Sequence, residues 1–578
     1  MGRLDERWVV DNPPSSRYPL YTRANVGEVF PDPVTPLTWT MAGVPGAEQG
    51  WRDAWDRFGA IDTGEYDPDN IEVLGVFGGY CYLNVSLSRV FGARVPGLTP
   101  EAIDFSFFGT QPGVPPYQAR EGDESPEHAQ RAGATLQWVM TTDSLPELLD
   151  DQQAMERLRA ERPDLSSLSE AELLARTREL MGTWFRRLFG QHIHTSFSAL
   201  TSAGVIAQVC EALGDPTLAM RLVAGLGGVD SAAPSWAMWD LGRLVAGSPA
   251  LTAQFDQGVE GLCDRLRADG DGDSDKFVQS FDHFLYAFGS RGPNEWEMRS
   301  PSWETTPQLA LAAIDRMRLA GDQDSPQGHH EALAADREQL TPSLLEAITD
   351  PEVKATFGAA LHSAAVFFPG RERTKTTVIR QIHECRVAMN ELGRRMVEAG
   401  HFDEVGDYAM LRDDEFDAFL ADPPAFRDVI RDRRSWCEEL ASLEPPFLLV
   451  GQPTPPSSWA RRGSTPVERA VAGDVLPGIP GCPGKATGRA RILSDSSDPG
   501  ALQPGDVLVA PITDPSWTPL FVPAAAVVVD VGSQVSHAVI VSRELGIPCV
   551  VSVTDATRRL ADGDTVTVDG TAGTVTVS

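Results

Sequence analysis

Between about residues 145 and 442, apolar residues recur three and four positions apart with charged residues between them. The segments 169–189, 307–320, 341–348 and 377–400 show this spacing most clearly. Apolar residues at that spacing gather on one face of an α-helix. The pattern therefore predicts a mainly helical region that begins at about residue 145.

Beyond about residue 476 the hydrophobic pattern shortens to runs of four to eight residues. These runs are bounded by Gly, Pro or Asp, which is typical of strands. They are ATGRARIL (486–493), GDVLVAP (505–511), AAAVVVDVG (524–532), GIPCVVSV (546–553), DTVTVDG (564–570) and GTVTVS (573–578). One helix of about eight residues interrupts them and begins at His537. The pattern predicts a small α/β domain over residues 477–578.

Pro, Ser and Gly dominate residues 446–476, so we predict a linker there. Residues 1 to about 130 are rich in Pro, Gly and aromatics, with a strand-like run at 70–85. The predicted fold class is multidomain α+β. A large domain over residues 1–445, mainly helical from about residue 145, precedes the linker and the small C-terminal domain (residues 477–578).

The chain has 49 basic and 82 acidic residues, for a net charge of −33. A field of that sign repels nucleic acid and anionic membrane surfaces, so we expect neither as a partner. Seven scattered cysteines with no CxxC pair indicate reduced thiols, and we find no signal peptide or membrane-spanning run. We expect a cytoplasmic protein.

His537 lies in the predicted first turn of a helix, after a polar turn. Free backbone N–H groups and the positive end of the helix dipole attract anions there and disfavour a protonated imidazole. A neutral, nucleophilic ring that becomes phosphorylated suits this position. The alternative is a histidine that merely packs or caps the helix.

Four segments of the C-terminal domain together resemble the phosphohistidine domain of the phosphoenolpyruvate-utilising enzyme family. They are 477–493, 505–521, GSQVSHAVIVSRELGIPCVV (532–551) and 563–577. The resemblance implies a swivelling β/β/α domain in which His537 carries a phosphoryl group between two remote sites. Ser533 stands where a second glycine is common, and Cys482 stands where serine is common.

The large domain resembles the acceptor-binding domain of the rifampin phosphotransferase family. The resemblance rests on NVGEVFPDPVTPLTW (25–39), FGGYCYLNV (77–85), GSRGPNEWEMRSPSWE (289–304) and RERTK (371–375). It implies that Arg371 and Lys375 belong to the active site. Their spacing of four places both on one helix face, where they suit a transferring phosphoryl group. The alternative is a solvated charge cluster paired with Glu372.

Within segment 289–304, Arg291 is a candidate second anion contact, and Glu295 and Glu297 are candidates for a base or a magnesium ligand. Solvent-facing carboxylates are the equal alternative. Trp39 and Trp296, with residues 107–116, are candidates to line an apolar acceptor pocket, although packing in the core explains them too. His192 and His194 lack a metal-ligand pattern and are interpreted as packing residues. The sequence identifies no metal ligands with certainty.

About 22 residues precede the first matched segment, so we expect the ATP-grasp domain of the family on a separate partner protein, as in the split phenylphosphate synthases. The expected cofactors are ATP, bound by that partner, and Mg²⁺. The expected activity is phosphoryl transfer through His537 to a hydroxyl of a small aromatic or natural-product-like acceptor. A phosphorylation-dependent dehydratase or ligase, or a non-catalytic ligand-binding relative, remain alternatives. We expect the C-terminal domain to swing about the linker and to meet the large domain through a modest, polar interface.

Overall fold

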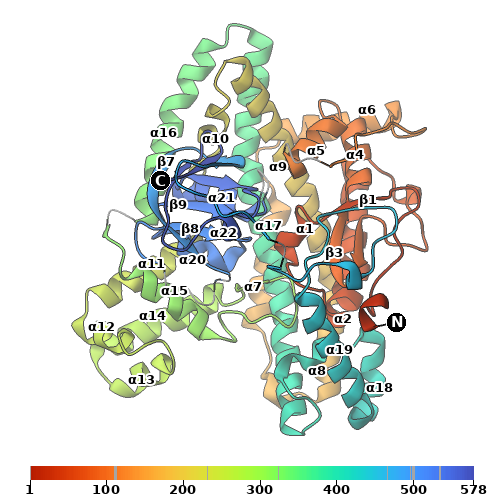
Figure 1. Ribbon diagram of the computed structural model, residues 1–578, viewed down its shortest axis with the longest axis vertical. Coiled ribbons are helices and arrows are strands. Elements are labelled where there is room, and N and C mark those ends of the chain that lie inside the picture. The colour runs from red at the N-terminus through yellow and green to blue at the C-terminus, as the bar shows by residue number, and fades with distance from the viewer. Residues whose placement is uncertain are drawn as a thin grey trace. The chain divides into compact units, whose positions relative to one another are not determined.

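The computed structural model describes residues 2–109, 113–228, 230, 232–322, 325–464, 466–494, 496, 502–532 and 536–578. The chain forms two compact units, whose elements are labelled in Figure 1. Unit 1 comprises Met1–Thr201, Trp296–Ser300 and Arg373–Pro466. Unit 2 comprises Ser202–Glu295, Pro301–Glu372 and Val467–Ser578. Neither unit is continuous in sequence, because helices α9 (Arg186–Ala212) and α17 (Pro351–Glu398) each begin in one unit and end in the other.

Unit 1 contains a four-stranded antiparallel sheet in the order β2-β3-β1-β4. The strands are β1 (Leu20–Thr22), β2 (Leu74–Phe77), β3 (Tyr80–Asn84) and β4 (Leu448–Val450). The run at 70–85, which the sequence left open as strands or irregular segments, therefore forms β2 and β3. Tyr21 pairs with Asn84 on one side and Leu449 on the other, so β1 joins distant parts of the sequence.

Helices supply most of the core of unit 1. The segment at 169–189, which was predicted to be helical, is helical in the structure. The helices lying wholly in this unit are α1 (Val26–Val29), α2 (Pro36–Thr38), α3 (Gln49–Phe58), α4 (Val85–Arg94), α5 (Pro100–Phe108), α6 (Pro126–Thr141), α7 (Pro146–Ala160), α8 (Glu170–Leu180), α18 (Phe416–Ala421) and α19 (Arg427–Ala441). Two π-helical segments, η2 (Trp39–Glu48) and η5 (Met181–Phe185), interrupt them.

The helical part of unit 2 precedes the C-terminal domain in sequence. Its helices are α10 (Leu218–Leu222), α11 (Ala233–Ala246), α12 (Pro249–Phe255), α13 (Leu262–Asp269), α14 (Gly272–Phe288), α15 (Pro307–Met317) and α16 (Pro326–Ala347). Helix α16 continues through Pro342, and α17 continues through Pro369. The predicted helices at 341–348 and 377–400 are therefore the ends of longer helices.

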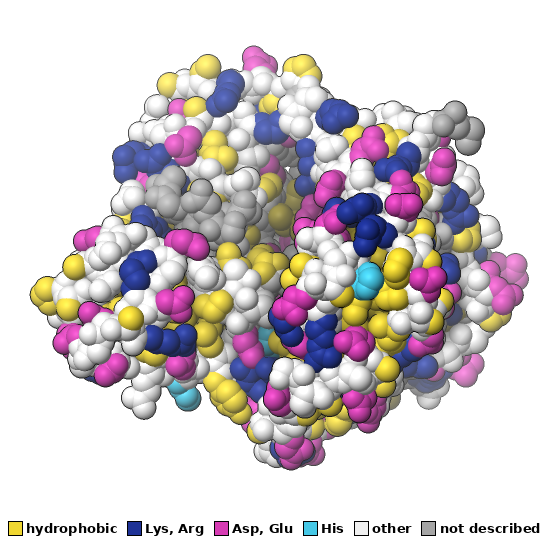
Figure 2. All heavy atoms as spheres, turned by 90° about the horizontal axis from the view of Figure 1, so that it is seen from below, with side chains coloured by type: hydrophobic (Ala, Val, Ile, Leu, Met, Phe, Trp, Pro, Cys, Tyr) yellow, Lys and Arg dark blue, Asp and Glu magenta, His cyan; other side chains and the backbone are white. Residues whose placement is uncertain are grey.

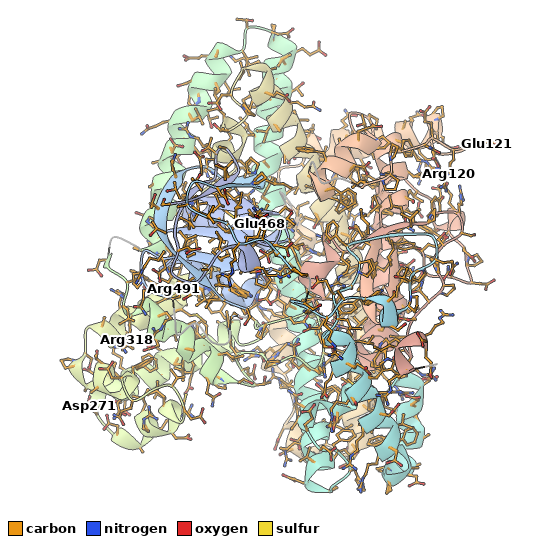
Figure 3. The ribbon with its side chains drawn as sticks, viewed as in Figure 1. Arg120, Glu121, Asp271, Arg318, Glu468 and Arg491 are labelled. Carbon is orange, nitrogen blue, oxygen red and sulfur yellow. The ribbon has the colours of Figure 1, made fainter. Side chains whose placement is uncertain are left out.

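The C-terminal domain is built on an eight-stranded sheet in the order β5-β12-β11-β7-β8-β9-β10-β6. Its strands are β5 (Val475–Pro477), β6 (Ile479–Cys482), β7 (Lys485–Ile492), β8 (Val507–Ala510), β9 (Ala526–Val529), β10 (Cys549–Val551), β11 (Thr565–Asp569) and β12 (Thr574–Val577). The parallel run β7 to β10 lies between antiparallel neighbours. Arg491, labelled in Figure 3, ties β7 to Asp506 at 2.9 Å and Asp562 at 2.7 Å. All six predicted strands are confirmed.

Three short helices cover this sheet: α20 (Thr518–Phe521), α21 (His537–Leu545) and α22 (Ala556–Arg559). The prediction of a helix that begins at His537 is confirmed. Trp517, Leu520 and Phe521 share one buried apolar cluster with residues of α11, α14 and α15. The expectation of a polar interface is therefore wrong at α20, because this helix is apolar on the face that packs against α11 and α15.

Most of the predicted linker is folded. Trp459 packs its ring against Tyr80 with centroids 6.0 Å apart, and Arg462 Nη2 donates to the Tyr80 hydroxyl at 3.1 Å. Ala470 N–H already donates to the Arg559 carbonyl of the C-terminal domain at 2.9 Å. The stretch between these two sets of contacts is therefore short, at about residues 463–469, and Thr465 within it lies outside the described residues.

No helix in the described part of the chain is long and apolar enough to cross a membrane. Figure 2 shows Asp and Glu side chains interspersed with Lys and Arg over the face in view. Ser533 and residues 110–112 of the candidate pocket segment 107–116 also lie outside the described residues.

Candidate active site

His537 is the first residue of α21, and Ser536 is the N-cap. Two threonine hydroxyls hold the imidazole: Thr518 Oγ1 lies 3.0 Å from Nε2 and Thr513 Oγ1 lies 3.3 Å from Nδ1. The ring of Phe521 meets the imidazole edge to face, with centroids 6.0 Å apart. The side chain is thus fixed through both nitrogens at the amino end of a helix, where a phosphoryl group is stabilised.

The loop from β8 to α20 supplies both hydroxyls and also reaches the helical part of unit 2. Asp514 Oδ2 accepts a hydrogen bond from the backbone N–H of Asn294 at 3.0 Å. Asn294 has a left-handed backbone, with φ 47°, which is uncommon for a residue other than glycine. The loop that holds His537 therefore contacts segment 289–304 directly.

Thr518→Val tests whether the hydroxyl orients the ring. Valine keeps the shape of threonine but cannot hydrogen-bond Nε2, so the imidazole loses its closest polar contact. We expect phosphorylation of His537 by phosphoramidate to slow roughly tenfold, the effect of losing about one hydrogen bond. Thr513→Val, at the longer 3.3 Å contact, serves as the comparison and should slow the reaction less. Equal labelling rates in all three proteins would exclude this role.

Arg371 and Lys375 lie one turn apart in the middle of α17, and both are partly buried. Arg371 forms an ion pair with Glu372, as the alternative interpretation proposed. Arg371 also lies close enough to α21 that its charge contributes to lowering the pKa of Arg543, after the larger effect of burial. Arg371 therefore lies by the carboxyl end of the helix that begins with His537.

The acidic candidates of segment 289–304 are buried, so they do not face solvent. Arg291 and Glu295 form an ion pair at 3.0 Å, with both side chains at most 3% exposed. Glu297 Oε1 accepts hydrogen bonds from Thr38 Oγ1 at 2.6 Å and Thr35 Oγ1 at 2.8 Å. Through these bonds Glu297 stabilises the start of α2.

Trp39 and Trp296 both line an apolar cavity of about 100 Å³ inside unit 1. Trp51, Phe185, Phe189 and His192 line the same cavity. His192 also hydrogen-bonds Thr374 Oγ1 through Nδ1 at 3.0 Å, next to Lys375 in sequence. The sequence analysis assigned His192 to packing, because a single histidine on an apolar helix face carries no pattern that reveals a cavity.

Two glycines allow the aromatic walls of this cavity to close. A Cβ atom at Gly43 would lie 2.4 Å from the Trp39 ring, and one at Gly46 would lie 2.1 Å from the Phe185 ring. Both glycines are in the π-helical segment η2, and Phe185 ends the π-helical segment η5. π-helical turns often mark functional sites, and here two of them border one cavity.

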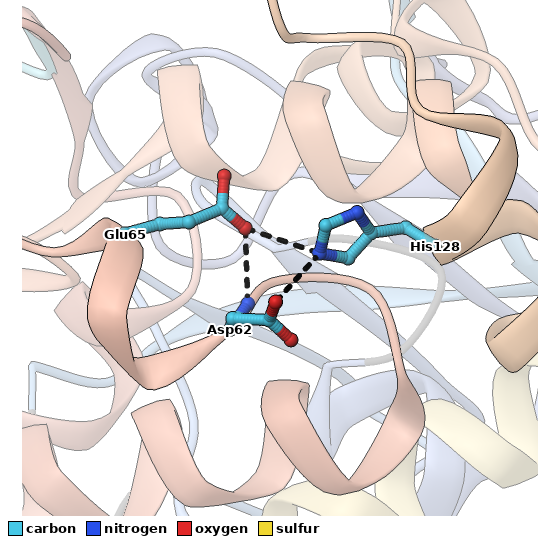
Figure 4. A group of neighbouring side chains, drawn as sticks. All are labelled: Asp62, Glu65 and His128. Carbon is cyan, nitrogen blue, oxygen red and sulfur yellow. Dashed lines mark hydrogen bonds and ion pairs between the residues drawn. The ribbon is translucent and has the colours of Figure 1, made fainter.

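Asp62, Glu65 and His128 form the one group of three potential metal ligands among the described residues (Figure 4). His128 Nε2 lies 3.2 Å from Glu65 and 3.4 Å from Asp62. Arg94 binds both oxygens of Glu65, and Arg131 hydrogen-bonds Asp62 and lowers its pKa. Because the arginines already neutralise both carboxylates, we interpret the group as an ion-pair network.

Comparisons with known proteins agree with this geometry. The family model "PEP-utilising enzyme, mobile domain" matches residues 502–573, which include His537, Thr513 and Thr518. The model "Rifampicin phosphotransferase fourth domain" matches residues 191–372. A rifampicin phosphotransferase of Streptomyces sviceus is 31% identical over 300 residues, covering 51% of this chain and 34% of that protein. The chain belongs to the phosphoenolpyruvate-utilising enzyme family. It is a member of the rifampicin phosphotransferase type.

Other relatives of this family member align over nearly all of the chain. The "Prodigiosin synthesizing transferase PigC" of Serratia marcescens is 28% identical, covering 96% of this chain and 63% of that protein. An uncharacterised protein of Mycobacterium tuberculosis is 28% identical, covering 98% and 62% respectively. The chain therefore spans less than two thirds of the length of these relatives.

Sequence reasoning missed the threonine pair around His537. Both lie in the segment 505–521 that carried the family resemblance, but a threonine in a Pro-rich loop has many uses, and only the fold shows that its hydroxyl meets the imidazole. It also missed Arg543 and Glu544, which lie in the last turn of the helix that begins at His537. In the structure both side chains are less than 10% exposed.

Proposed function

We propose that the chain is a phosphotransferase, or the catalytic subunit of one, that passes a phosphoryl group through His537 to a hydroxyl of a small aromatic or natural-product-like acceptor. The observation that carries the proposal is the imidazole of His537, held by two hydroxyls at a helix start inside the matched mobile domain. In the first step a P–N bond to the imidazole forms as the bond from phosphorus to the donor breaks. In the second step the acceptor oxygen binds phosphorus, the P–N bond breaks and the hydroxyl proton is lost.

Arg371 and Lys375 are proposed to stabilise charge on the phosphoryl group during transfer. The ion pair with Glu372 offsets part of the positive charge of Arg371, so Lys375 would contribute more of the charge stabilisation. Arg291 would provide a further cationic contact, and its partner Glu295 would orient it. Glu297 supports helix α2 through its threonine contacts, and we assign it no role as a base.

ATP is proposed as the phosphoryl source, bound with Mg²⁺ by a separate ATP-grasp protein. The one candidate metal group described here is neutralised by Arg94 and Arg131, so we assign no magnesium ligand and route no step through the ion.

The acceptor is proposed to bind in the cavity beside Trp39 and Trp296. Aromatic walls and a single histidine suit a flat, apolar molecule that carries a hydroxyl. To test the proposal, the protein is phosphorylated with ³²P-phosphoramidate, freed of reagent and mixed with aromatic alcohols that include 2-naphthol. We expect a phosphorylated alcohol, detected by mass spectrometry. Discharge no faster with the alcohols than with water would contradict the proposal.

Gly46→Ala tests the cavity separately from the chemistry. The new methyl group forces the Phe185 ring aside, toward the cavity, because Phe185 is 3% exposed and stacks on Phe189. We expect 2-naphthol binding, followed by tryptophan fluorescence, to weaken at least tenfold. Overpacking of this kind also costs roughly 1–3 kcal/mol of stability. Gly182→Ala is the matched control, because no atom lies within 4 Å of its new methyl group; equal losses in both variants would exclude the cavity as the binding site.

A second candidate function is ligation or elimination through a phosphorylated intermediate. The likeness to a prodigiosin synthesizing transferase over 96% of the chain favours this candidate, since that protein is named for the synthesis of a product. Phosphate would then be released, and the final product would lack it. The same mass spectrometry separates the two functions.

A further inference from the structure

The carboxyl end of α21 buries two charged residues side by side. Arg543 is 6% exposed and Glu544 is 3% exposed. Among the described residues, the basic side-chain nitrogens closest to the Glu544 carboxylate are Arg543 Nε at 3.7 Å and His330 Nδ1 at 4.0 Å, and His330 is charged only when protonated. Both distances exceed that of a hydrogen bond, so the buried charge of Glu544 is poorly compensated.

The two residues pack against helices α16 and α17 of the same unit. The Arg543 guanidinium lies over the ring of Phe368 in α17, 4.9 Å from its centroid. Leu333 of α16 lies under Gly546, which ends α21 with a left-handed backbone at φ 66°. We call the surface formed by His330, Leu333, Arg337, Phe368, Arg371 and Glu372 the docking surface.

The C-terminal domain also packs against α11 and α15 of the same unit, and this contact is apolar, through α20. An apolar contact of that kind favours the docked arrangement, at about 25 cal/mol per Å² of buried surface. A buried charge without close hydrogen bonds acts in the opposite direction, and replacing such groups by neutral ones is often stabilising. The docked arrangement therefore contains one contact that stabilises it, through α20, and one that destabilises it, at the buried charge of Glu544.

We propose that Arg543 and Glu544 are positioning residues that weaken docking of the C-terminal domain on α16 and α17, so that His537 can leave this arrangement during each cycle. The inference rests on the proposed function, because only a carrier histidine must visit two sites. It also gives Arg371 and Glu372 a role in docking beside the role proposed for Arg371 in transfer.

The proposal implies that docking depends on pH. Burial raises the pKa of Glu544 from 4.5 to about 7, and the charge of Glu372 adds to this while Arg543 and Arg337 oppose it. Undocking exposes the carboxyl group, so docking is strongest with Glu544 protonated and weakens as pH rises from about 4.5 through about 7. Besides each other, Arg543 and Glu544 face titratable or charged groups on three elements. These groups are His330 and Arg337 on α16, Arg371 and Glu372 on α17, and Cys482 on β6.

Protonation of His330 at low pH affects docking in the opposite direction to protonation of Glu544. Burial and Arg337 lower the pKa of His330, so its protonation at acid pH disfavours docking. Measurements between pH 6.5 and 8.5 in a His330→Ala background isolate Glu544, because an undocked His330 with its ordinary pKa of 6.5 would otherwise offset up to about twofold of the Glu544 effect at the lower limit. Over that range the docking equilibrium constant should fall about fourfold, as follows from a pKa that moves between 4.5 and about 7.

Single-molecule fluorescence transfer in the full chain measures both the docked fraction and the opening rate. Dyes are placed through Lys485→Cys on β7 and Val353→Cys on α17, both exposed, in a Cys263→Ser background that removes the one described cysteine that is not buried. Glu544→Gln should dock at least tenfold more strongly at pH 8, open more slowly and lose the pH dependence. Glu346→Gln, an exposed change on α16, is the matched control and should behave like the unmodified chain.

Unchanged opening rate and pH dependence in Glu544→Gln, or weaker docking, would overturn the proposal. The opening rate can be measured even when nearly all molecules are docked, so it reports stronger docking that the docked fraction alone would not resolve. Because the dyes report docking without any chemistry, this result is independent of whether the chain transfers phosphate to an alcohol. A purely structural role for Glu544 would lower the melting temperature of the Gln variant, whereas the proposal predicts an equal or higher one.

Discussion

The His537→Ala chain is expected to take up no acid-labile, base-stable phosphate from ³²P-phosphoramidate, a loss of at least a thousandfold relative to the unmodified chain. The reason is chemical: alanine has no nucleophile, and the two hydroxyls around His537 cannot form the P–N bond in its place. Filter binding after alkaline and acid washes measures the label. The fold should survive, because the imidazole lies at a helix start and meets the Phe521 ring edge to face, with no close stacking to lose.

His330→Ala is the control for non-specific labelling, because His330 is also partly buried in unit 2 but lies on α16 beside Glu544. It should be labelled like the unmodified chain. Base-stable label that persists in His537→Ala would place the phosphoryl group on another histidine and would exclude His537 as the carrier.

A disulfide that locks the C-terminal domain on α16 should nearly abolish multiple turnover while leaving acceptor binding intact. A Cβ atom at Gly546 would lie 3.6 Å from Leu333, so Leu333→Cys with Gly546→Cys places two thiols within reach. The left-handed backbone at Gly546 costs the cysteine about 1–2 kcal/mol. Phosphoryl transfer needs near-contact geometry at both the donor and the acceptor, so a fixed His537 can serve only one of them.

Reduction with dithiothreitol should restore turnover in the same sample, which separates locking from damage by the substitutions. Each single-cysteine variant should turn over normally. The connection at about residues 463–469 spans roughly 20 Å when extended, at about 3.3 Å per residue, so the swing needs little further unfolding. A locked chain that completes repeated cycles at the normal rate would contradict the swivelling mechanism.

The C-terminal domain could be predicted closely from sequence because its signals are local. Short apolar runs between Gly, Pro and Asp gave the strands, and the polar turn before His537 gave the helix start. The apolar pocket could also be predicted in part, since Trp39 and Trp296 were candidates to line it. Whether they line a cavity or fill a core depends on Gly43 and Gly46, and such close approach between helices leaves no periodic pattern.

The division into units could not be predicted, because it joins segments that lie far apart in the chain. The predicted helical segments at 341–348 and 377–400 are only the ends of α16 and α17, which continue through Pro342 and Pro369 because packing along their length outweighs one lost hydrogen bond. The burial of Glu544 and Glu297 could not be predicted from the sequence either. A carboxylate in a sequence is expected at the surface, and only the fold shows that Glu297 is buried with close hydrogen-bond partners and Glu544 without them.

The most direct test of the account is to find where the phosphoryl group resides and whether it moves on. The chain is charged with phosphoramidate or with its ATP-dependent partner, digested at alkaline pH and examined by tandem mass spectrometry, before and after a brief exposure to the acceptor. The account predicts phosphate on His537 alone before exposure, and its loss from His537 in step with the appearance of phosphate on the acceptor or in solution. Phosphate on a different residue, or a phospho-His537 that the acceptor never discharges, would contradict it.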